Sequence, residues 1–465
     1  MSDAVIAHLV DQRDVILARL DALLRIPSVS TDPSFAPAMD AARAMLLARL
    51  TEAGLDEVQL LDGGIGQPAV YAAWTGAPGK PTLIIYGHYD VQPADPVELW
   101  HSPPFEPTIR DGRIYARGAS DVKDSTTIAI ETVAAFLKVT GKLPINVKIF
   151  LEGEEESGSP GLRGIVERFR DKLSADAMLS ADGGRTSTTV PTVGIGHRGI
   201  TGLELTVRTA DSDGHSGRYG GAARNALREI MALLTTLHDD QGRIQVANFG
   251  ADAAPISNAA RAAAAAVPFD EAQFFGDFGG TRWGDPAYTV REATTLRPTI
   301  EFNGLWGGYT GAGAKTVLPA EAHAKITMRL SPGMSPANAQ AALRAHLCAH
   351  LPKGVTLEIA EEFGGTPSNS LHEEHRLVRT ALAVLEAASG QPAFPSRAGG
   401  SIPITAIFKE MLGLDAMTFG LAMPDEGAHA PNEFFRLSSF DEGLRTWPML
   451  FSALGEMSAE EFNRS

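Results

Sequence analysis

Helical patterns alternate with short apolar stretches over much of the first 198 residues of this 465-residue chain. Helical spacing covers residues 40–53, 126–138 and 161–172, and stretches typical of buried strands cover residues 82–86, 145–151 and 177–180. Such alternation predicts a largely parallel sheet with helices on both faces. In sheets of this kind, functional side chains gather at the carboxyl ends of the strands. We therefore expect the chemistry of the chain at those strand ends.

The pattern changes around Gly199. Alternating apolar and polar residues predict half-exposed strands at 201–209 and 320–330, and helical spacing predicts helices at 225–237 and 337–351. These elements are typical of a small α+β domain, one sheet with helices on one face. The expected fold class is therefore α/β, a mixed sheet flanked by helices, formed by residues 1–198 and 370–465. Residues 199–369 are expected to be inserted as the second domain.

Two regions give simpler predictions. Residues 1–22 predict an amphipathic helix that Pro27 stops, and this helix lacks the basic start and continuous apolar core of a signal peptide. Within the insertion, residues 250–297 are irregular and rich in Ala, Gly and Asp, and only 259–266 predict a helical turn.

Composition excludes several classes of function. The net charge of −16 disfavours nucleic acid as a partner and offers an anionic membrane nothing basic to hold. No stretch approaches the ~20 uninterrupted apolar residues that span a bilayer. A single cysteine, Cys348, rules out an internal disulfide. We expect a cytoplasmic protein that binds neither nucleic acid nor membrane.

An acidic run follows the strand predicted at 145–151. Glu152, Glu154, Glu155 and Glu156 lie within five positions of its end. Crowded carboxylates at the edge of a core repel one another and lose hydration, so a compensating cation is one explanation. A solvated acidic turn is the other, and most acidic runs are of that kind.

Other polar residues stand at equivalent places. His88 and Asp90 emerge after the strand at 82–86, Asp121 precedes the helix expected near Asp124, Asp182 follows the strand at 177–180, and His429 follows the last strand. Each has an ordinary alternative: a hydrogen-bonded histidine, a helix cap, a turn residue or a loop residue. Together with Glu155 and Glu156 they can converge on one sheet edge. Two imidazoles and several carboxylates suit a pair of divalent ions such as zinc, manganese or cobalt.

These residues lie in motifs that resemble a known family. The motifs are Gly-His-Tyr-Asp-Val-Gln-Pro (87–93), Trp100 to Pro107, Arg-Gly-Ala-Ser-Asp (117–121), Glu-Gly-Glu-Glu-Glu-Ser-Gly-Ser (152–159), His-Ser-Gly (215–217), Gly-Gly-Ser-Ile-Pro (399–403) and Gly-Ala-His (427–429). In this order they resemble the M20 family of dinuclear metallopeptidases, and particularly its carnosinase-like dipeptidases.

The resemblance implies a role for each ligand. Asp121 would bridge two ions, His88 and Asp182 would complete one metal site, and Glu156 and His429 would complete the other. Zinc is the first expectation, with manganese or cobalt as alternatives.

The resemblance also implies roles for residues beside the ions. Glu155 would be the general base, and Asp90 would be the carboxylate behind His88. His215 would reach across a homodimer interface to the scissile carbonyl, which makes the inserted domain a lid and dimerisation domain. Residues that would bind substrate are Thr316, Arg329 and Ser401, with Arg397 able to add charge near Ser401.

The implied activity is hydrolysis of small peptides that carry a free carboxylate, by a water activated between two ions. An N-acyl-amino-acid deacylase or desuccinylase with the same site stays open, as does a non-catalytic metal-dependent peptide-binding protein. The chain departs from the family after Asp121: the usual Asp-Asp-Lys-Gly is here Asp121-Val122-Lys123-Asp124. The family also tends to have a cis peptide bond after the bridging aspartate.

Overall fold

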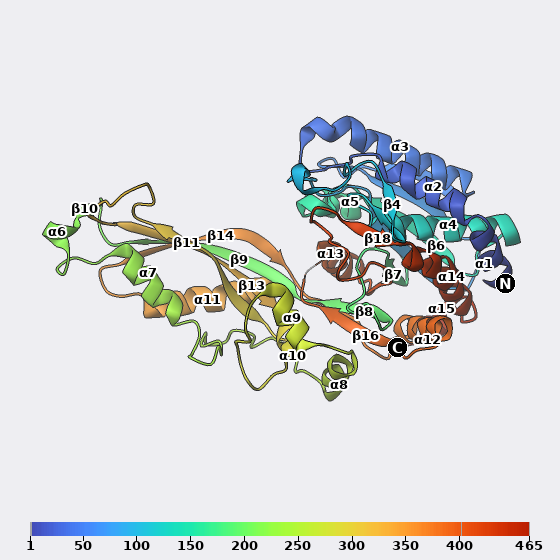
Figure 1. Cartoon of the computed structure of the whole chain (residues 1–465). Coiled ribbons are helices and arrows are strands. Elements are labelled where there is room, and N and C mark those ends of the chain that lie inside the picture. The colour runs from blue at the N-terminus through green and yellow to red at the C-terminus, as the bar shows by residue number, and fades with distance from the viewer. Residues whose placement is uncertain (1, 401, 465) are drawn as a thin grey trace.

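Two separate sheets organise the chain in the computed structural model, which describes residues 2–400 and 402–464, apart from the side chains of 277 and 361–364. Figure 1 shows the larger sheet inside a layered body that contains both termini. The smaller sheet extends away from that body as an elongated second unit. Among the described residues, no helix has the length and apolar character needed to cross a membrane.

The larger sheet has nine strands, and its centre is parallel. The strands, in spatial order, are β1 (Asp56–Leu61), β2 (Ala69–Trp74), β6 (Asn146–Glu152), β3 (Thr82–His88), β7 (Ala177–Ser180), β17 (Ala416–Thr418), β8 (Thr192–His197) and β15 (Asn369–Ser370), with β16 (Phe394–Ala398) also paired to β8. The four strands β6, β3, β7 and β17 run parallel, whereas β1, β2 and β15 pair antiparallel with their neighbours. The prediction of a mixed sheet is therefore confirmed.

Alternation along each strand divides the core between the two faces of the sheet. In β3, Leu83 and Ile85 enter one apolar cluster, and Ile84 and Tyr86 enter another. The first cluster is covered by α1 (Ser2–Asp11), α2 (Arg13–Leu24), α3 (Ala36–Glu52), α4 (Lys123–Thr140), α12 (Arg376–Ser389), α14 (Leu437–Leu454) and α15 (Ala459–Asn463). The second is covered by α5 (Leu162–Arg168) and α13 (Pro403–Leu412). Every central strand is thus buried on both faces, as the parallel arrangement requires.

The smaller sheet is antiparallel and has helices on one face. Its order is β11 (Thr299–Gly307), β13 (Glu321–Leu330), β9 (Gly199–Arg208) and β14 (Thr356–Thr366). Alternate side chains of β9 and β13 pack against α7 (Ala226–Thr235) and α11 (Pro336–His350). At its far end lie β10 (Gly214–His215), α6 (Ser216–Tyr219) and β12 (Val317–Leu318) (Figure 1).

Two crossings join the sheets, and they run side by side. The first passes from β8 through Arg198 into β9, and the second passes from β14 into β15. β14 pairs with β9, and β15 pairs with β8, so the second crossing lies directly against the first. The proposed boundary at 198/199 falls at the first crossing, whereas the one at 369/370 falls inside β15, which pairs with β8 of the larger sheet. Both stay our proposal for the domain boundaries.

Local structure differs from the sequence prediction in two regions. Residues 250–297 contain three helices, not one turn: α8 (Asn258–Ala266), α9 (Glu271–Phe278) and α10 (Val290–Thr295). Each begins at a side-chain cap, supplied by Ser257, Asp270 and Thr289 respectively. The N-terminal helix is divided at Gln12 into α1 and α2.

A small sheet beside the larger one connects two loops. Its strands are β4 (Thr108–Arg110), β5 (Arg113–Tyr115) and β18 (Phe434–Arg436), and β18 pairs with β5. The chain after β5 leads to Asp121, and the chain before β18 contains His429. This pairing brings the two loops to the same edge of the larger sheet.

Candidate metal centre

Three parallel strands deliver polar side chains to one edge of the larger sheet. β3 ends at His88, β6 is followed by the short 3-10 helix η3 (Glu155–Ser157), and β7 is followed by Asp182. Asp121 comes from the loop before α4, where its peptide bond with Val122 is cis. Val122, not Asp121, occupies the cap position of α4, so the alternative role of Asp121 as a helix cap is wrong.

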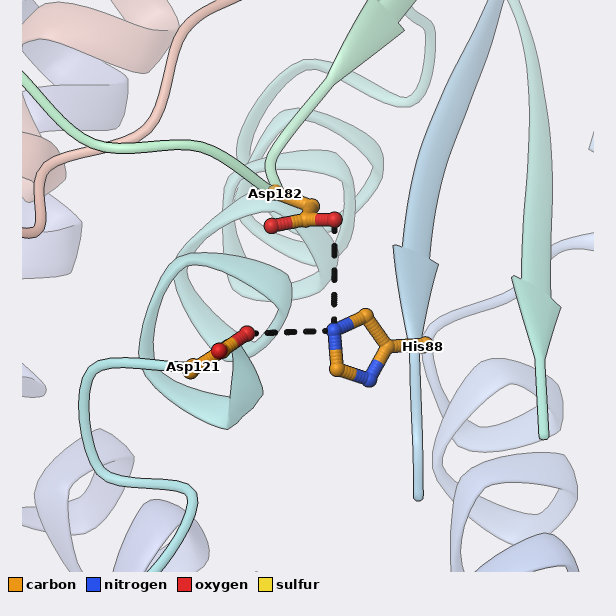
Figure 2. Close-up of side chains that lie close together, drawn as sticks. All are labelled: His88, Asp121 and Asp182. Atoms are coloured by element: carbon orange, nitrogen blue, oxygen red, sulfur yellow. Dashed lines mark hydrogen bonds and ion pairs between the residues drawn. The ribbon is translucent and has the colours of Figure 1, made fainter. Parts of the chain in front are cut away.

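The first group of converging side chains is His88, Asp121 and Asp182 (Figure 2). His88 Nε2 lies 3.2 Å from Asp121 Oδ1 and 3.9 Å from Asp182 Oδ2. One potential ligand atom from each residue lies within 4.8 Å of the other two. That spacing suits a single divalent ion between them.

The second group is Asp121, Glu156 and His429. His429 Nε2 lies 2.8 Å from Asp121 Oδ2 and 3.2 Å from Glu156 Oε2. Asp121 therefore directs one carboxylate oxygen to each group. A carboxylate placed in this way can bridge two ions.

The hydrogen bonds of His88 indicate what the first group lacks. Its Nδ1 donates to the backbone carbonyl of Asp90 over 3.0 Å, so a neutral imidazole presents the lone pair of Nε2 to the carboxylates of Asp121 and Asp182. Lone pair and carboxylates repel one another unless a proton or a cation lies between them. The donor set of imidazole nitrogen and carboxylate oxygen fits zinc, manganese or cobalt.

Two of the buried carboxylates, those of Asp182 and Glu155, are not fully compensated by the neighbouring histidines. Burial raises the pKa of Asp182 to about 7, and it raises the pKa of Glu155 to about 9 despite the opposing effect of His88. Hydrogen bonds from His429 and His88 outweigh burial at Asp121 and hold its pKa below the ordinary range. Hydrogen bonds to Asp121 and Glu156 raise the pKa of His429 to about 10. The side chains therefore fit divalent cations, which would stabilise the ionised carboxylates.

The four carboxylates of the acidic run have four different environments. Glu152 accepts a hydrogen bond from the Tyr86 hydroxyl over 2.6 Å, and Glu154 accepts one from the backbone of Gly161 over 3.2 Å. Glu156 belongs to the second group, whereas Glu155 belongs to neither group of the described residues. Glu155 thus lies beside the groups without contributing to them.

Asp90 connects the two groups. Its Oδ1 lies 3.4 Å from His88 Nδ1, and its Oδ2 accepts hydrogen bonds from Ser30 Oγ over 2.6 Å and from the backbone N–H of Glu156 over 3.1 Å. The carboxylate expected behind His88 is therefore placed there, and it also holds the backbone of the second group.

Two residues that support the groups were not singled out from the sequence. Gln92 donates from Nε2 to Glu156 Oε2 over 2.8 Å, and it stands in the 87–93 motif. Glu433 is fully buried and accepts four hydrogen bonds from the loop that ends at Asp121. The donors are Arg117 Nη1 (2.6 Å) and the backbone N–H groups of Gly118 (3.0 Å), Ser120 (2.9 Å) and Asp121 (3.2 Å). Contacts of this kind with main-chain groups leave no spacing pattern in a sequence.

The described residues that are expected to bind substrate belong to neither group of candidate ligands. His215 is exposed on β10 at the far end of the smaller sheet, and Thr316 lies beside it, where its carbonyl accepts from Ser216 N over 3.0 Å. Arg329 is half-buried in β13. Arg397 Nη2 pairs with Glu373 over 2.8 Å, so its charge is balanced locally. Ser401 lies outside the described residues.

Comparison with known proteins identifies the family to which the chain belongs. The family model described as Peptidase family M20/M25/M40 matches residues 84–452. A Cys-Gly metallodipeptidase of Candida albicans is 27% identical over 451 residues, covering 92% of each chain. A Beta-Ala-His dipeptidase of Rattus norvegicus is 28% identical over 423 residues, covering 88% of this chain and 85% of that one.

Solved structures agree with this result. Human carnosine dipeptidase 1 matches with a TM-score of 0.79 and 25% identity, over 98% of this chain and 99% of that one. An M20 family metallo-carboxypeptidase from Sulfolobus solfataricus matches with a TM-score of 0.81 and 28% identity, over 95% and 99%. The similarity thus covers both sheets and the groups at the edge of the larger one.

Proposed function

Because this chain belongs to peptidase family M20/M25/M40 and is a hydrolase of peptide bonds, we propose that it is a dipeptidase that uses two divalent ions, zinc first among the candidates. The observation that carries the proposal is the arrangement of Asp121, which presents one oxygen to each of two groups of side chains. A single metal ion or a structural acidic cluster would not require a shared carboxylate between two such groups.

The proposed ligands are His88 and Asp182 for one ion, Glu156 and His429 for the other, and Asp121 for both. When bound, the two ions would supply polarisation of the scissile carbonyl and a lowered pKa for the attacking water. Glu155 accepts the proton of that water on its carboxylate and passes it to the leaving amine. Asp90 fixes the orientation of His88 through the hydrogen bond from Nδ1 to its carbonyl.

The size of the substrate is inferred from the named relatives. Those relatives are dipeptidases, one for Cys-Gly and one for Beta-Ala-His, and both are matched over most of their length. We propose that Arg329 and Ser401 hold the free carboxylate of a dipeptide. A buried clamp for a carboxylate favours exopeptidase action, because a substrate without that group would leave polar side chains unpaired.

We also propose that the protein acts as a homodimer. His215 and Thr316 lie at the far end of the smaller sheet, away from the metal centre of their own chain (Figure 1). The edge strand β11 exposes Phe302, Leu305 and Trp306, which are 47%, 45% and 39% accessible. An unpaired edge with exposed apolar side chains supports pairing with a second copy. His215 would then reach the scissile carbonyl of the partner.

An activity panel tests the proposed function. Protein stripped with a chelator and reloaded with Zn²⁺ or Mn²⁺ is offered Ala-Ala, β-Ala-His and Cys-Gly, together with N-acetyl-alanine and N-succinyl-alanine. We expect metal-dependent release of free amino acids from dipeptides at rates well above those for the acylated compounds. Faster cleavage of the acylated substrates would assign a deacylase, and no cleavage of any of them would rule out both.

A further inference from the structure

Few side chains hold the loop that carries His429. We call residues 427–432, Gly-Ala-His-Ala-Pro-Asn, the His429 loop. A backbone hydrogen bond closes its base, where the N–H of Phe434 donates to the carbonyl of Glu426 over 3.0 Å. Only His429 and Asn432 in this loop have polar side chains, and His429 and its two neighbours are exposed. Asn432 is therefore the one side chain, besides the candidate ligand, that can anchor the loop through hydrogen bonds.

Asn432 makes two hydrogen bonds outside its own loop. Its Oδ1 accepts from the backbone N–H of His101 over 2.8 Å, and its Nδ2 donates to the carbonyl of Leu99 over 2.9 Å. The amide thus joins the His429 loop to the segment that contains the short 3-10 helix η2 (Val97–Leu99). Asparagine suits this place because the backbone has a φ of +64°, a left-handed conformation that asparagine tolerates better than most residues do.

His429 depends on such an anchor more than His88 does. The side chain of His88 is fully buried, and its Nδ1 donates to the carbonyl of Asp90. The side chain of His429 is 55% exposed, and its Nδ1 has no hydrogen-bond partner among the described residues. A ligand imidazole is normally oriented by the hydrogen bond of its second nitrogen. Without that bond, the position of the ring depends on the backbone that carries it.

The segment bound by Asn432 also supports a second candidate ligand of the same group. Gln92, at the start of the segment, donates from Nε2 to Glu156 Oε2 over 2.8 Å and from its backbone N–H to Glu156 Oε1 over 3.2 Å. Residues 92–101 thereby connect two of the three residues of the second group, Glu156 directly and His429 through Asn432. In the part of the chain that the structure describes, no hydrogen bond joins this segment to the two residues that belong to the first group alone.

We propose that Asn432 is a positioning residue for the ion of the second group. It acts through the main chain, because its link to Leu99 and His101 fixes where His429 presents Nε2. This inference rests on the proposed two-ion function, and it gives the two ions different supports. The first ion depends on side chains at strand ends, whereas the second depends on hydrogen bonds between two loops. Loss of the Asn432 side chain should therefore weaken binding of the second ion and leave the first ion bound.

Substitution of Asn432 by glycine tests this role. Glycine removes both hydrogen bonds and adopts the left-handed backbone without strain. The full-length protein is stripped with a chelator and titrated with Zn²⁺ in competition with a chelating dye. We expect the unmodified protein to bind two ions. In Asn432→Gly we expect one Zn²⁺ to bind with unchanged affinity and the other to bind about 10–100-fold more weakly.

Two further variants control for flexibility and identify the affected ion. Ala430→Gly adds a glycine to the same exposed loop and leaves both hydrogen bonds of Asn432 in place, so it should keep the affinity for both ions. In a His429→Ala background, Asn432→Gly should cause no further loss, because the residue through which it acts is already absent. Circular dichroism verifies that each variant is folded.

Hydrogen exchange gives a second readout that needs no substitution, and it decides the question if Asn432→Gly does not fold. The N–H of His101 donates to Asn432, so an ion held by His429 should slow exchange in the peptide that contains His101, although residues 92–101 include no proposed ligand. Such coupling between binding and protection is reciprocal. Exchange is measured by mass spectrometry on the metal-free and the Zn²⁺-loaded protein. Equal exchange in the two states would overturn the role of Asn432.

The outcomes separate this inference from the proposed function. If the unmodified protein binds fewer than two ions, the two-ion function fails and this inference fails with it. If the unmodified protein binds two ions and Asn432→Gly weakens both or neither, the positioning role is overturned and the two-ion function stands.

Discussion

Glu433 holds the loop that carries Asp121, although it belongs to neither group of candidate ligands. It is fully buried, and its two oxygens accept all four hydrogen bonds from residues 117–121. A single side chain therefore fixes the direction of the carboxylate that serves both groups. Mutation of a hydrogen-bond partner of this kind typically lowers metal affinity or activity by about 10–100-fold.

The first prediction is that Glu433→Gln weakens metal binding. The amide keeps the shape of the side chain but turns an N–H₂ group towards N–H donors, so two of the four hydrogen bonds are lost. We expect Zn²⁺ affinity to fall by about 10–100-fold, measured by competition with a chelating dye. Glu167→Gln on the exposed side of α5 is the control. Unchanged affinity in Glu433→Gln would show that Asp121 is positioned by other contacts.

The second prediction concerns Glu155, which lies beside both groups and contributes to neither. We expect Glu155→Gln to lower kcat by about 10²–10⁴-fold, since the variant cannot accept a proton. Metal content measured by plasma mass spectrometry should stay at the level of the unmodified protein. Loss of metal together with activity would mean that Glu155 is a ligand and not the base.

The third prediction is a pH dependence of the metal-free protein. Burial raises the pKa of Asp182 from 3.8 to about 7 and that of Glu155 from 4.5 to about 9. The folded state then keeps protons that the unfolded state releases, so the free energy of unfolding falls as pH rises from about 4 to about 9. Thermal unfolding at several pH values should show this decrease, and Zn²⁺ should raise Tm most at the alkaline end. A metal-free Tm that increases over this range contradicts these carboxylate shifts.

Site residues that follow a predicted strand could be identified from the sequence. Residues that support the site through hydrogen bonds to main-chain groups could not. His88, Asp182 and the acidic run each follow an apolar strand, and a parallel sheet brings such ends together. Their convergence was therefore accessible to sequence reasoning. Glu433 acts on backbone N–H groups 312 to 315 positions away, and no periodicity records a contact of that kind.

At the scale of elements, the paired crossings between the sheets leave no space for a side chain at Gly199. A Cβ there would lie 2.5 Å from Thr366 O and 2.7 Å from Ser368 N, and both are backbone atoms of the second crossing. Glycine is needed because the two backbones approach closely, not because the chain turns.

The fourth prediction follows from this contact. Gly199→Ala should lower the free energy of unfolding by about 1–3 kcal/mol, because the backbones must separate to accept the methyl group. Denaturation in urea measures the change. Gly276→Ala in α9 has nothing within 4 Å of the new Cβ and should be neutral or slightly stabilising. Equal stability of Gly199→Ala and the unmodified protein would mean that the crossings adjust freely.

Elements with one dominant pattern were predicted more accurately than short or alanine-rich ones. β7 was expected at 177–180 and has those bounds, and β13 alternates as expected. Residues 69–74 were not predicted as a strand, although they form β2. Three alanines among six apolar residues do not distinguish a buried strand from a helix, and only pairing with β6 decides. Two of the short helices of 250–297, α8 and α10, pack against β16, a contact that the local sequence does not reveal.

At the scale of the whole molecule, the separation of His215 from the metal centre predicts an active site made from two chains. His215 belongs to β10, at the far end of the smaller sheet (Figure 1), and Glu155 follows β6 of the larger sheet. In a two-fold symmetric dimer, each site would combine Glu155 of one copy with His215 of the other.

The fifth prediction tests this by complementation. His215→Ala and Glu155→Gln should each be inactive alone, and after exchange of subunits the mixed dimer should contain one intact site of two. Random exchange at equal amounts should then recover about a quarter of the unmodified activity, since half of the dimers are mixed. Activity is measured before and after mixing, and dimer exchange is followed by mass spectrometry. No recovery despite complete exchange would place His215 and Glu155 in the same chain's site or remove His215 from catalysis.

Because only two adjacent backbone segments join the sheets, a rotation at these segments would move the whole smaller sheet relative to the larger one. β9 alone has ten residues and spans about 33 Å, so a rotation of about 10° at Arg198 and Gly199 displaces its far end by about 6 Å. Small changes in two backbone segments are thereby amplified at the tip that carries His215. The position of His215 relative to the larger sheet is consequently governed by backbone torsion angles at Arg198 and Gly199, at the opposite end of β9.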